Sequence, residues 1–105
     1  MGNNEPISEQ YRIAALEWVD ADAAARLLEE TKSAVFAQKV LAQGDIAVNR
    51  AETNVRGSLE WMDYLQKVID ARTNANRLRV RMDYLRMRAM EQQSEEANRR
   101  MESRL

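Results

Sequence analysis

Nine residues in the second half of the chain follow one another at alternating spacings of three and four, and this regularity constrains the fold more than any other feature. They are Trp61, Tyr64, Val68, Ala71, Ala75, Leu78, Met82, Leu85 and Ala89. A heptad pattern sustained over four repeats is typical of a long helix that packs along its length against another helix. The sequence therefore predicts an all-α protein with coiled-coil-like contacts along these nine residues, which we call the 61–89 seam.

Turn-forming residues are scarce, which limits the number of elements. The chain of 105 residues has three glycines and one proline, too few for the turns of an all-β or nucleotide-binding α/β domain. Ser8 is suited to cap a helix, and Gly44 followed by Asp45 predicts a helix end and a new helix start. We expect a flexible lead-in over 1–7 and one domain over 8–105, a long antiparallel helical hairpin with helices at about 8–43 and 45–104.

One position in the second helix leaves its continuity open. Gly57 and Ser58 follow Arg56 directly, and a glycine next to a residue that can cap a helix favours a kink or a break. The sequence does not decide between one helix over 45–104 and two helices separated near Gly57.

Both predicted helices carry a second apolar face. In the second helix it lies roughly opposite the seam and contains Val55, Leu59, Met62, Ile69, Val80, Tyr84 and Met87. In the first helix the two faces are a stripe through Leu16, Leu27 and Leu41, and an opposite face with Tyr11, Trp18, Ala25, Phe36 and Val40. A single hairpin covers only one face of each helix, so the chain is expected to oligomerise.

The expected oligomer is a homodimer held by aromatic residues. We assign its interface to Tyr11, Trp18, Phe36, Trp61 and Tyr64. The alternative is a monomeric three-helix bundle, formed by a break at Gly57, which would cover these faces itself. Asn76 lies between Ile69 and Val80. A buried asparagine at such a position can fix the register of association; the alternative is that Asn76 occupies a partly solvated gap.

Charge is divided unevenly along the chain. The net charge is -1, but residues 1–71 hold seven basic and twelve acidic residues, whereas 72–105 hold nine arginines and five acidic residues. A hairpin hinged at Gly44 would set Arg72 opposite Glu17, and residues 77–81 near Glu9 and Tyr11. Arg72, Arg77 and Arg79 are therefore expected to form salt bridges between the helices. Beyond about residue 82 the first helix ends, which leaves five arginines on an overhang: Arg86, Arg88, Arg99, Arg100 and Arg104.

The cationic part of the second helix is the predicted partner-binding site. Arginine, tyrosine and methionine are enriched at the centres of protein interfaces, and they gather here as Arg81, Tyr84, Arg86, Met87, Arg88 and Met90. A nucleic acid is the alternative ligand, through Arg81, Tyr84, Arg86 and Arg88, since guanidinium groups bind phosphates and tyrosine stacks on bases. The acidic pI of about 5.5 counts against it.

Several function classes are excluded by composition. The chain has no cysteine and no histidine, so disulfides, thiolate or imidazole zinc sites and Ser-His or Cys-His catalysis are impossible. We expect no enzyme activity, no cofactor and no bound metal. No apolar run approaches the length of a membrane span and no signal peptide is recognisable, which favours a cytoplasmic protein without a membrane partner.

Two segments carry a resemblance to known proteins. They are residues 71–105, ARTNANRLRVRMDYLRMRAMEQQSEEANRRMESRL, and residues 49–55, NRAETNV. The chain resembles a group of small, functionally unassigned helical proteins of tailed bacteriophages and prophages over roughly its last 60 residues, but not over 1–44. The resemblance implies an accessory protein of the bacterial host's cytoplasm that modulates or scaffolds a host or phage protein. The other classes kept open are a nucleic-acid-binding accessory in phage replication or recombination and a structural component of the virion.

Overall fold

The protein is built from helices alone over the residues that the structure describes. The computed structural model describes residues 5–104, and these contain α1 (Ile7–Leu41), α2 (Val48–Arg56) and α3 (Leu59–Arg104) without a strand. This confirms the predicted all-α class. The predicted flexible lead-in lies partly outside the described residues, at 1–4. Its last residue, Ile7, is the first residue of α1.

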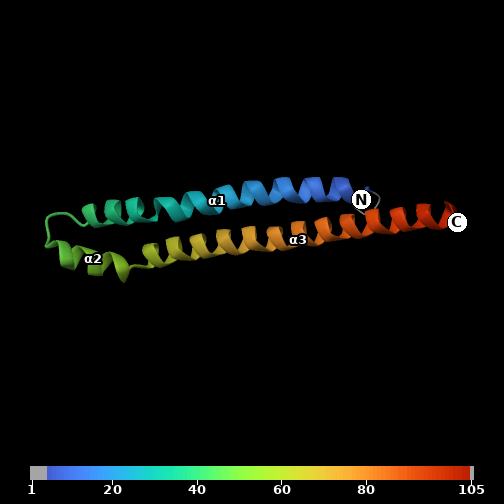
Figure 1. Cartoon of the computed structure of the whole chain (residues 1–105). Coiled ribbons are helices and arrows are strands. Elements are labelled where there is room, and N and C mark those ends of the chain that lie inside the picture. Colours follow the sequence, from blue (N-terminus) through green and yellow to red (C-terminus); the bar gives the residue numbers. More distant parts are fainter. Residues whose placement is uncertain (1–4, 105) are drawn as a thin grey trace.

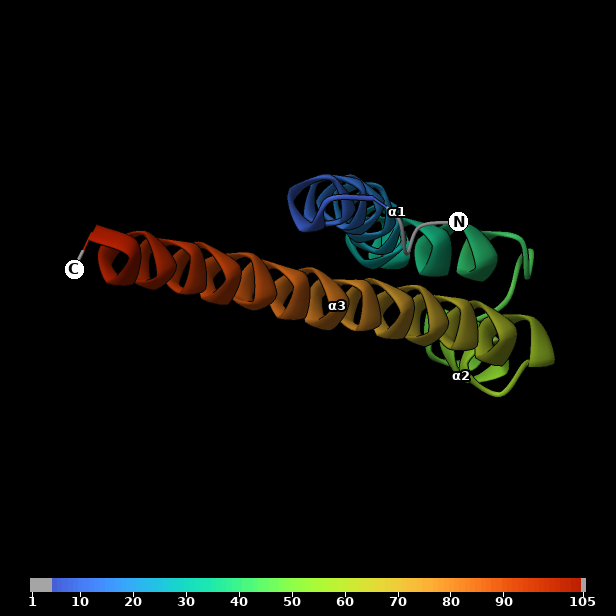
Figure 2. The same ribbon diagram turned by 90° about the vertical axis from the view of Figure 1, so that its right-hand side faces the viewer.

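The molecule is a thin rod with principal extents of 84 × 25 × 16 Å. Helices α1 and α3 lie side by side and run in opposite directions along its length, and α2 lies at the turn between them (Figure 1). The C-terminal end of α3 extends beyond the first turn of α1, as a second view shows (Figure 2). With so little thickness, most side chains remain near the surface.

The turn after α1 contains a glycine in the left-handed backbone conformation, as the sequence predicts. The next helix, however, starts at a different residue from the predicted one. Helix α1 ends at Leu41, and Gly44 has φ of +88° and donates its N–H to the Leu41 carbonyl at 3.2 Å. Asp45 does not cap the following helix, because α2 starts only at Val48. Ala47 is its N-cap residue and offers no side-chain hydrogen bond. The predicted cap at Ser8 is also wrong, since the N-cap residue of α1 is Pro6.

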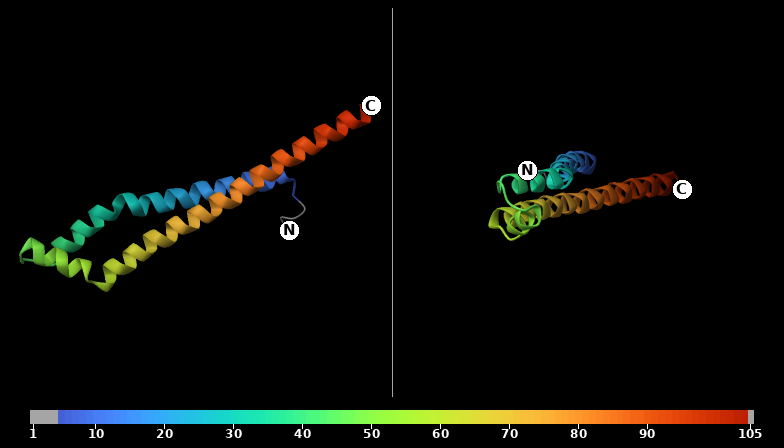
Figure 3. Two further views of the ribbon diagram at one scale, coloured as in Figure 1. Left: turned by 60° about the horizontal axis from the view of Figure 1, so that its bottom comes forward. Right: turned by 90° about the vertical axis from the view of Figure 1, so that its left-hand side faces the viewer.

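The open question at Gly57 is resolved by a break. Helix α2 ends at Arg56 and α3 starts at Leu59, and the two ribbons meet at an angle (Figure 3). The Ser58 hydroxyl accepts the backbone N–H of Trp61 at 3.2 Å and donates to the Val55 carbonyl at 2.7 Å. One serine thus caps the start of α3 and closes the end of α2.

The 61–89 seam is the face of α3 that packs on α1. All nine of its residues are buried or half-buried, and the buried ones are Trp61, Ala75 and Leu85. Opposite it, Leu59 is 77% exposed and Val80 is 69% exposed. Val55, which the sequence places on the same outer face, is instead buried, because it belongs to α2 and not to α3. The heptad pattern therefore predicts the inner face of α3 correctly.

In α1 the structure reverses the two predicted faces. Leu16, Leu27 and Leu41 are 52%, 63% and 80% exposed, whereas the opposite face, with Ala14 and Ala25 fully buried, packs on α3. Burying aromatic rings removes far more apolar surface from water than burying a stripe interrupted by acidic residues. The face that carries the aromatic residues is therefore the inner one.

The five residues assigned to an oligomer interface accordingly pack within one chain. The Phe36 and Trp61 rings meet edge to face at 5.0 Å, and Trp61 stacks on Tyr64 at 5.4 Å. Tyr64 donates its hydroxyl to the Leu28 carbonyl at 2.8 Å. Tyr11 and Trp18 are half-buried on the same inner face of α1. These rings lie between α1 and α3 within one chain, so most of their surface is used there.

The register between the long helices differs from the expected one by about two helical turns. Arg72 contacts Asp22 and Glu29, not Glu17. The difference arises because 42–58 form a loop, α2 and a bend at the end of the rod instead of continuing as one helix from Gly44. As a result α1 reaches further along α3, and Ile7 lines shallow surface depressions together with Gln92 and Glu96. The overhang starts near residue 93, not 83.

Candidate interaction surface on helix α3

The predicted partner-binding residues lie along one stretch of α3, with Tyr84 and the two methionines on its outer side and the three arginines on its flanks. Tyr84, Met87 and Met90 are 55%, 52% and 58% exposed, and Arg81, Arg86 and Arg88 are exposed as well. Between them, Leu85 is buried and Ala89 is half-buried against α1. The inner residues anchor this stretch of α3, so the six side chains project from a helix that is fixed in place.

Positive charge at this surface is only partly neutralised. Arg88 binds Glu91 at 2.9 Å, one turn further along α3. Within 5–104, Arg81 and Arg86 form no ion pair. A shallow depression on the same helix is lined by Arg79, Asp83, Arg86, Met87, Met90, Glu91, Ser94 and Glu95. The surface combines guanidinium groups with methionine side chains, which adapt to differently shaped apolar partners.

The overhang carries fewer arginines than expected, because of the changed register. Arg99, Arg100 and Arg104 lie beyond α1, but Arg86 and Arg88 lie beside its first turns. Arg88 lines the same surface depression as Ile7. Arg99 is 4.0 Å from Glu95 within α3.

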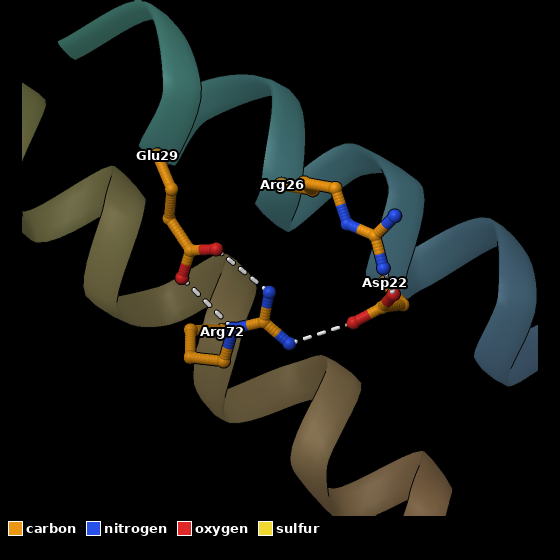
Figure 4. Close-up of polar contacts among 4 residues, drawn as sticks. All are labelled: Asp22, Arg26, Glu29 and Arg72. Atoms are coloured by element: carbon orange, nitrogen blue, oxygen red, sulfur yellow. Dashed lines mark hydrogen bonds and ion pairs between the residues drawn. The ribbon is translucent and has the colours of Figure 1, made fainter.

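Arg72 forms the central polar contact between the two long helices (Figure 4). It binds Glu29 through two parallel hydrogen bonds of 2.8 and 2.7 Å, and donates a third, of 2.7 Å, to Asp22. Arg26 binds the other oxygen of Asp22 at 2.8 Å. Two-point contact between a guanidinium and a carboxylate is the strongest geometry for such pairs. The cluster fixes the register of α1 on α3.

The same contacts alter the acidity of both carboxyl groups. Hydrogen bonds from Arg72 lower the pKa of Asp22 and of Glu29, and partial desolvation opposes this only in part. The carboxylates in turn raise the pKa of Arg72. All of these groups therefore stay charged at neutral pH, which makes the cluster a structural contact and not a source of exchangeable protons.

Stability is consequently expected to decline in acid. Lowered folded-state pKa values give a contribution that is complete above about pH 5 and disappears as the pH falls below about 4, through the lowered values. Thermal unfolding followed by circular dichroism should show a falling melting temperature over this range, and Arg72→Gln should flatten the curve. Arg12→Gln is the control, because Arg12 lowers only the pKa of Glu9, within one helix. An equal flattening in both variants would contradict a special role for Arg72.

The other expected bridges between the helices are not formed. The guanidinium of Arg79 lies 5.9 Å above the centre of the Trp18 ring, since the changed register places an aromatic residue opposite it and not a carboxylate. Arg77 is exposed and forms no ion pair with any described residue. The pairing that sequence reasoning missed is Lys39 with Glu60 at 3.3 Å. Periodicity gives no signal for it, because it depends on the register.

Metal-site clusters and membrane-spanning helices are both absent from the described residues. Within 5–104 no three acidic side chains gather as a metal site would require. None of the three helices combines the length and the apolar character needed to cross a membrane.

Comparison of the chain with protein-family models, with curated proteins and with solved structures found no match.

Proposed function

We propose that this chain is a non-enzymatic binding protein whose partner is a protein with an acidic surface that also carries apolar side chains. The observation that supports the proposal is the exposed group of Arg81, Arg86 and Arg88 around Met87 and Met90 on a helix face anchored by Leu85. Guanidinium groups would select the acidic partner and fix its orientation, and the methionines would supply the apolar contact area.

The source and place of action follow from the resemblance of 71–105 to phage proteins. We propose a phage-type accessory protein of the bacterial cytoplasm, which modulates or scaffolds a host or phage protein. The α1–α3 pair, with heptad spacing along α3, would serve as a coiled-coil-like hairpin that presents this surface.

Nucleic acid is the second candidate ligand, favoured by one observation. Arg81 has no carboxylate partner among the described residues, and Tyr84 and Arg88 follow it on the same stripe of α3, with Tyr84 55% exposed. Such a strip could bind phosphates and stack on a base. Asp83 and Glu91 interrupt it, which is why the acidic protein partner ranks first.

A pull-down from a bacterial lysate, with and without nuclease, tests the two candidates together. We expect the wild-type chain to retain a protein that resists nuclease, and Arg86→Glu with Arg88→Glu to lose it at least about tenfold, as when interface charges are reversed. Arg50→Glu with Lys67→Glu is the control, because it makes the same change in net charge at exposed positions elsewhere.

Other results would count against the protein partner. Retention that nuclease abolishes, together with binding of a labelled oligonucleotide that falls steeply with salt, would assign the surface to nucleic acid. Equal retention by wild type and by Arg86→Glu with Arg88→Glu would remove this surface from the function. Assembly of the pure protein into rings or larger particles would favour the third class, a virion component.

A further inference from the structure

A second heptad pattern runs along the face of α3 that points away from α1. Its apolar members are Leu59, Met62, Ile69, Val80, Met87 and Met90, which are between 52% and 77% exposed. Its polar members are Gln66, Thr73, Asn76 and Asp83, all exposed. These ten positions alternate at spacings of three and four, and we call them the outer stripe. A long apolar stripe in water is a marker of an interaction site.

The outer stripe reads the same from both ends in chemical character. From Leu59 the order is apolar, apolar, polar, apolar, polar, and from Met90 backwards it is the same. The centre of this symmetry lies between residues 74 and 75. A stripe with this symmetry matches a copy of itself that runs in the opposite direction, which is the requirement of an isologous twofold interface.

We propose that the outer stripe binds a second copy of this chain, with the two α3 helices antiparallel and the twofold axis between residues 74 and 75. The facing pairs would be Leu59 with the partner's Met90, Met62 with the partner's Met87, and Ile69 with the partner's Val80. Polar residues meet polar ones, as Gln66 faces the partner's Asp83 and Thr73 faces the partner's Asn76. No apolar position of the outer stripe faces a polar one.

Charged and polar residues on one flank of the outer stripe are complementary in the same register. Asp70 would lie beside the partner's Arg77, and Asp63 beside the hydroxyl of the partner's Tyr84. All four side chains are exposed, and within 5–104 neither Arg77 nor Asp63 forms an ion pair. The twofold axis produces each contact twice. Charge complementarity of this kind selects register more than it adds affinity.

The other flank carries like charges that are already engaged within each chain. There Arg72 would approach the partner's Arg79. Arg72 is bound to Asp22 and Glu29, and Arg79 lies over the Trp18 ring. Because Asp22 and Glu29 balance the charges of Arg72 and Arg26, the approach of Arg72 to a second guanidinium costs less than that of two free arginines.

Other arrangements of the same faces conflict with the sequence. A parallel pair would set Asp83 against the partner's Asp83. An antiparallel pair shifted by one heptad in one direction would set Leu59 against the partner's Asp83. A shift in the other direction would set Asp63 beside the partner's Glu91 and Arg77 beside the partner's Arg77. The register centred between residues 74 and 75 avoids all of these contacts.

The contact area suits a reversible dimer. The outer stripe spans about 47 Å at 1.5 Å per residue, and a helix is about 10 Å wide. The contact would bury about 500 Å² on each chain, roughly 1,000 Å² in total, at the lower end of specific interfaces. Because α1 packs on the opposite face of α3, dimerisation would leave the contacts within each chain intact.

This dimer does not depend on the proposed function, but both use Met87 and Met90, so dimerisation and binding of the partner protein would compete for these two side chains. In the dimer these two methionines form the outermost layers of the contact, while Arg81, Arg86 and Arg88 stay at its rim. The last turns of α3, 91–104, would extend past the contact at both ends. Loss of the dimer and loss of the protein partner are therefore separable by variants.

The mass of the pure protein in solution tests the proposal directly. Analytical ultracentrifugation of the full chain over about a hundredfold range of concentration should show a rise from 12.1 kDa towards twice that mass, because association depends on concentration. Ile69→Glu with Val80→Glu should hold the mass at the monomer value. Both residues are exposed, so circular dichroism should show an unchanged helix content. Leu16→Glu with Leu27→Glu, on the exposed face of α1, is the matched control and should still dimerise.

A charge exchange tests the register. Asp70→Arg or Arg77→Asp alone would create two like-charge pairs and should weaken the dimer by about tenfold. The two changes together restore opposite charges and should recover the wild-type dissociation constant. Residues 70 and 77 are seven apart in one helix, too far for direct contact, so recovery would not arise within one chain.

The antiparallel direction of the two α3 helices can be tested with introduced cysteines, since the chain has none of its own. Met62→Cys mixed with Met87→Cys should form a disulfide between the two different chains on oxidation, whereas Met62→Cys alone should not link to itself. A mass that stays at the monomer value at every concentration would overturn the proposal. So would a dimer that survives Ile69→Glu with Val80→Glu, a failure of the charge exchange to recover, or linkage of Met62→Cys to itself.

Discussion

Replacing Trp61 by alanine is expected to cause the largest loss of stability of any single change in the chain. Trp61 is 7% exposed and contacts the rings of Phe36, 5.0 Å away, and Tyr64, 5.4 Å away. It is also the residue whose backbone N–H is capped by Ser58. Its side chain thus joins α1, the start of α3 and the bend after α2.

The expected cost is about 3–5 kcal/mol, as for other buried tryptophans truncated to alanine. A domain of this size has a total stability of only about 5–15 kcal/mol, so the variant should lose a large fraction of its stability. Urea unfolding followed by circular dichroism measures the loss. All chains must be compared at one protein concentration, because any self-association adds to the apparent stability.

Leu41→Ala is the control for this prediction. Leu41 is 80% exposed, so its truncation removes little buried surface and should change stability by less than about 0.5 kcal/mol. If Trp61→Ala and Leu41→Ala had similar effects, the ring cluster would not be the centre of the fold.

The inner face of α3 could be predicted from the sequence because it depends only on spacing within one helix. The 61–89 seam has one large or small apolar residue at every third or fourth position, so no other element is needed to identify it. The break at Gly57 could not be predicted in this way, because it does not depend on spacing alone. Whether Ser58 caps a new helix depends on what the end of the rod packs against.

The inner face of α1 and the register could not be read in the same way. Tyr11 and Trp18 on one side, and Leu16 and Leu27 on the other, give two stripes of similar period. The choice between them depends on which one fits the surface of α3. The register depends on how many residues the turn consumes, and the sequence signal at Gly44 gives only the start of that turn. Arg72 was therefore assigned to the wrong carboxylate.

The exposed faces were predicted in kind but not in residues. The sequence indicated an apolar surface left over by the pairing of two helices, and the structure leaves Ile69, Val80 and Met87 outside. The aromatic residues that the sequence predicts for that surface lie between α1 and α3 instead. This exchange follows from the choice of face in α1, because the face that carries its aromatic residues is the one that packs on α3.

The close approach of α1 and α3 leads to the second large effect, at Ala25. Ala25 and Ala75 have no exposed surface at all, and both lie where the two long helices pack on each other. Small residues at a helix contact allow the two backbones to approach, and a tightly packed site leaves no room for additional atoms. Ala25→Leu should therefore force α1 away from α3 near the cluster of Arg72 with Asp22.

The neighbouring residue provides a matched control for Ala25→Leu. Ala24 is exposed on the same helix, and leucine and alanine have similar helix propensities, so Ala24→Leu should leave stability almost unchanged. Ala25→Leu should lower it by about 1–3 kcal/mol, the usual cost of overpacking. Urea unfolding at equal protein concentration gives the comparison. If the two variants were equally stable, α1 would not be packed on α3 through its alanine positions, and the assignment of the inner face of α1 would be wrong.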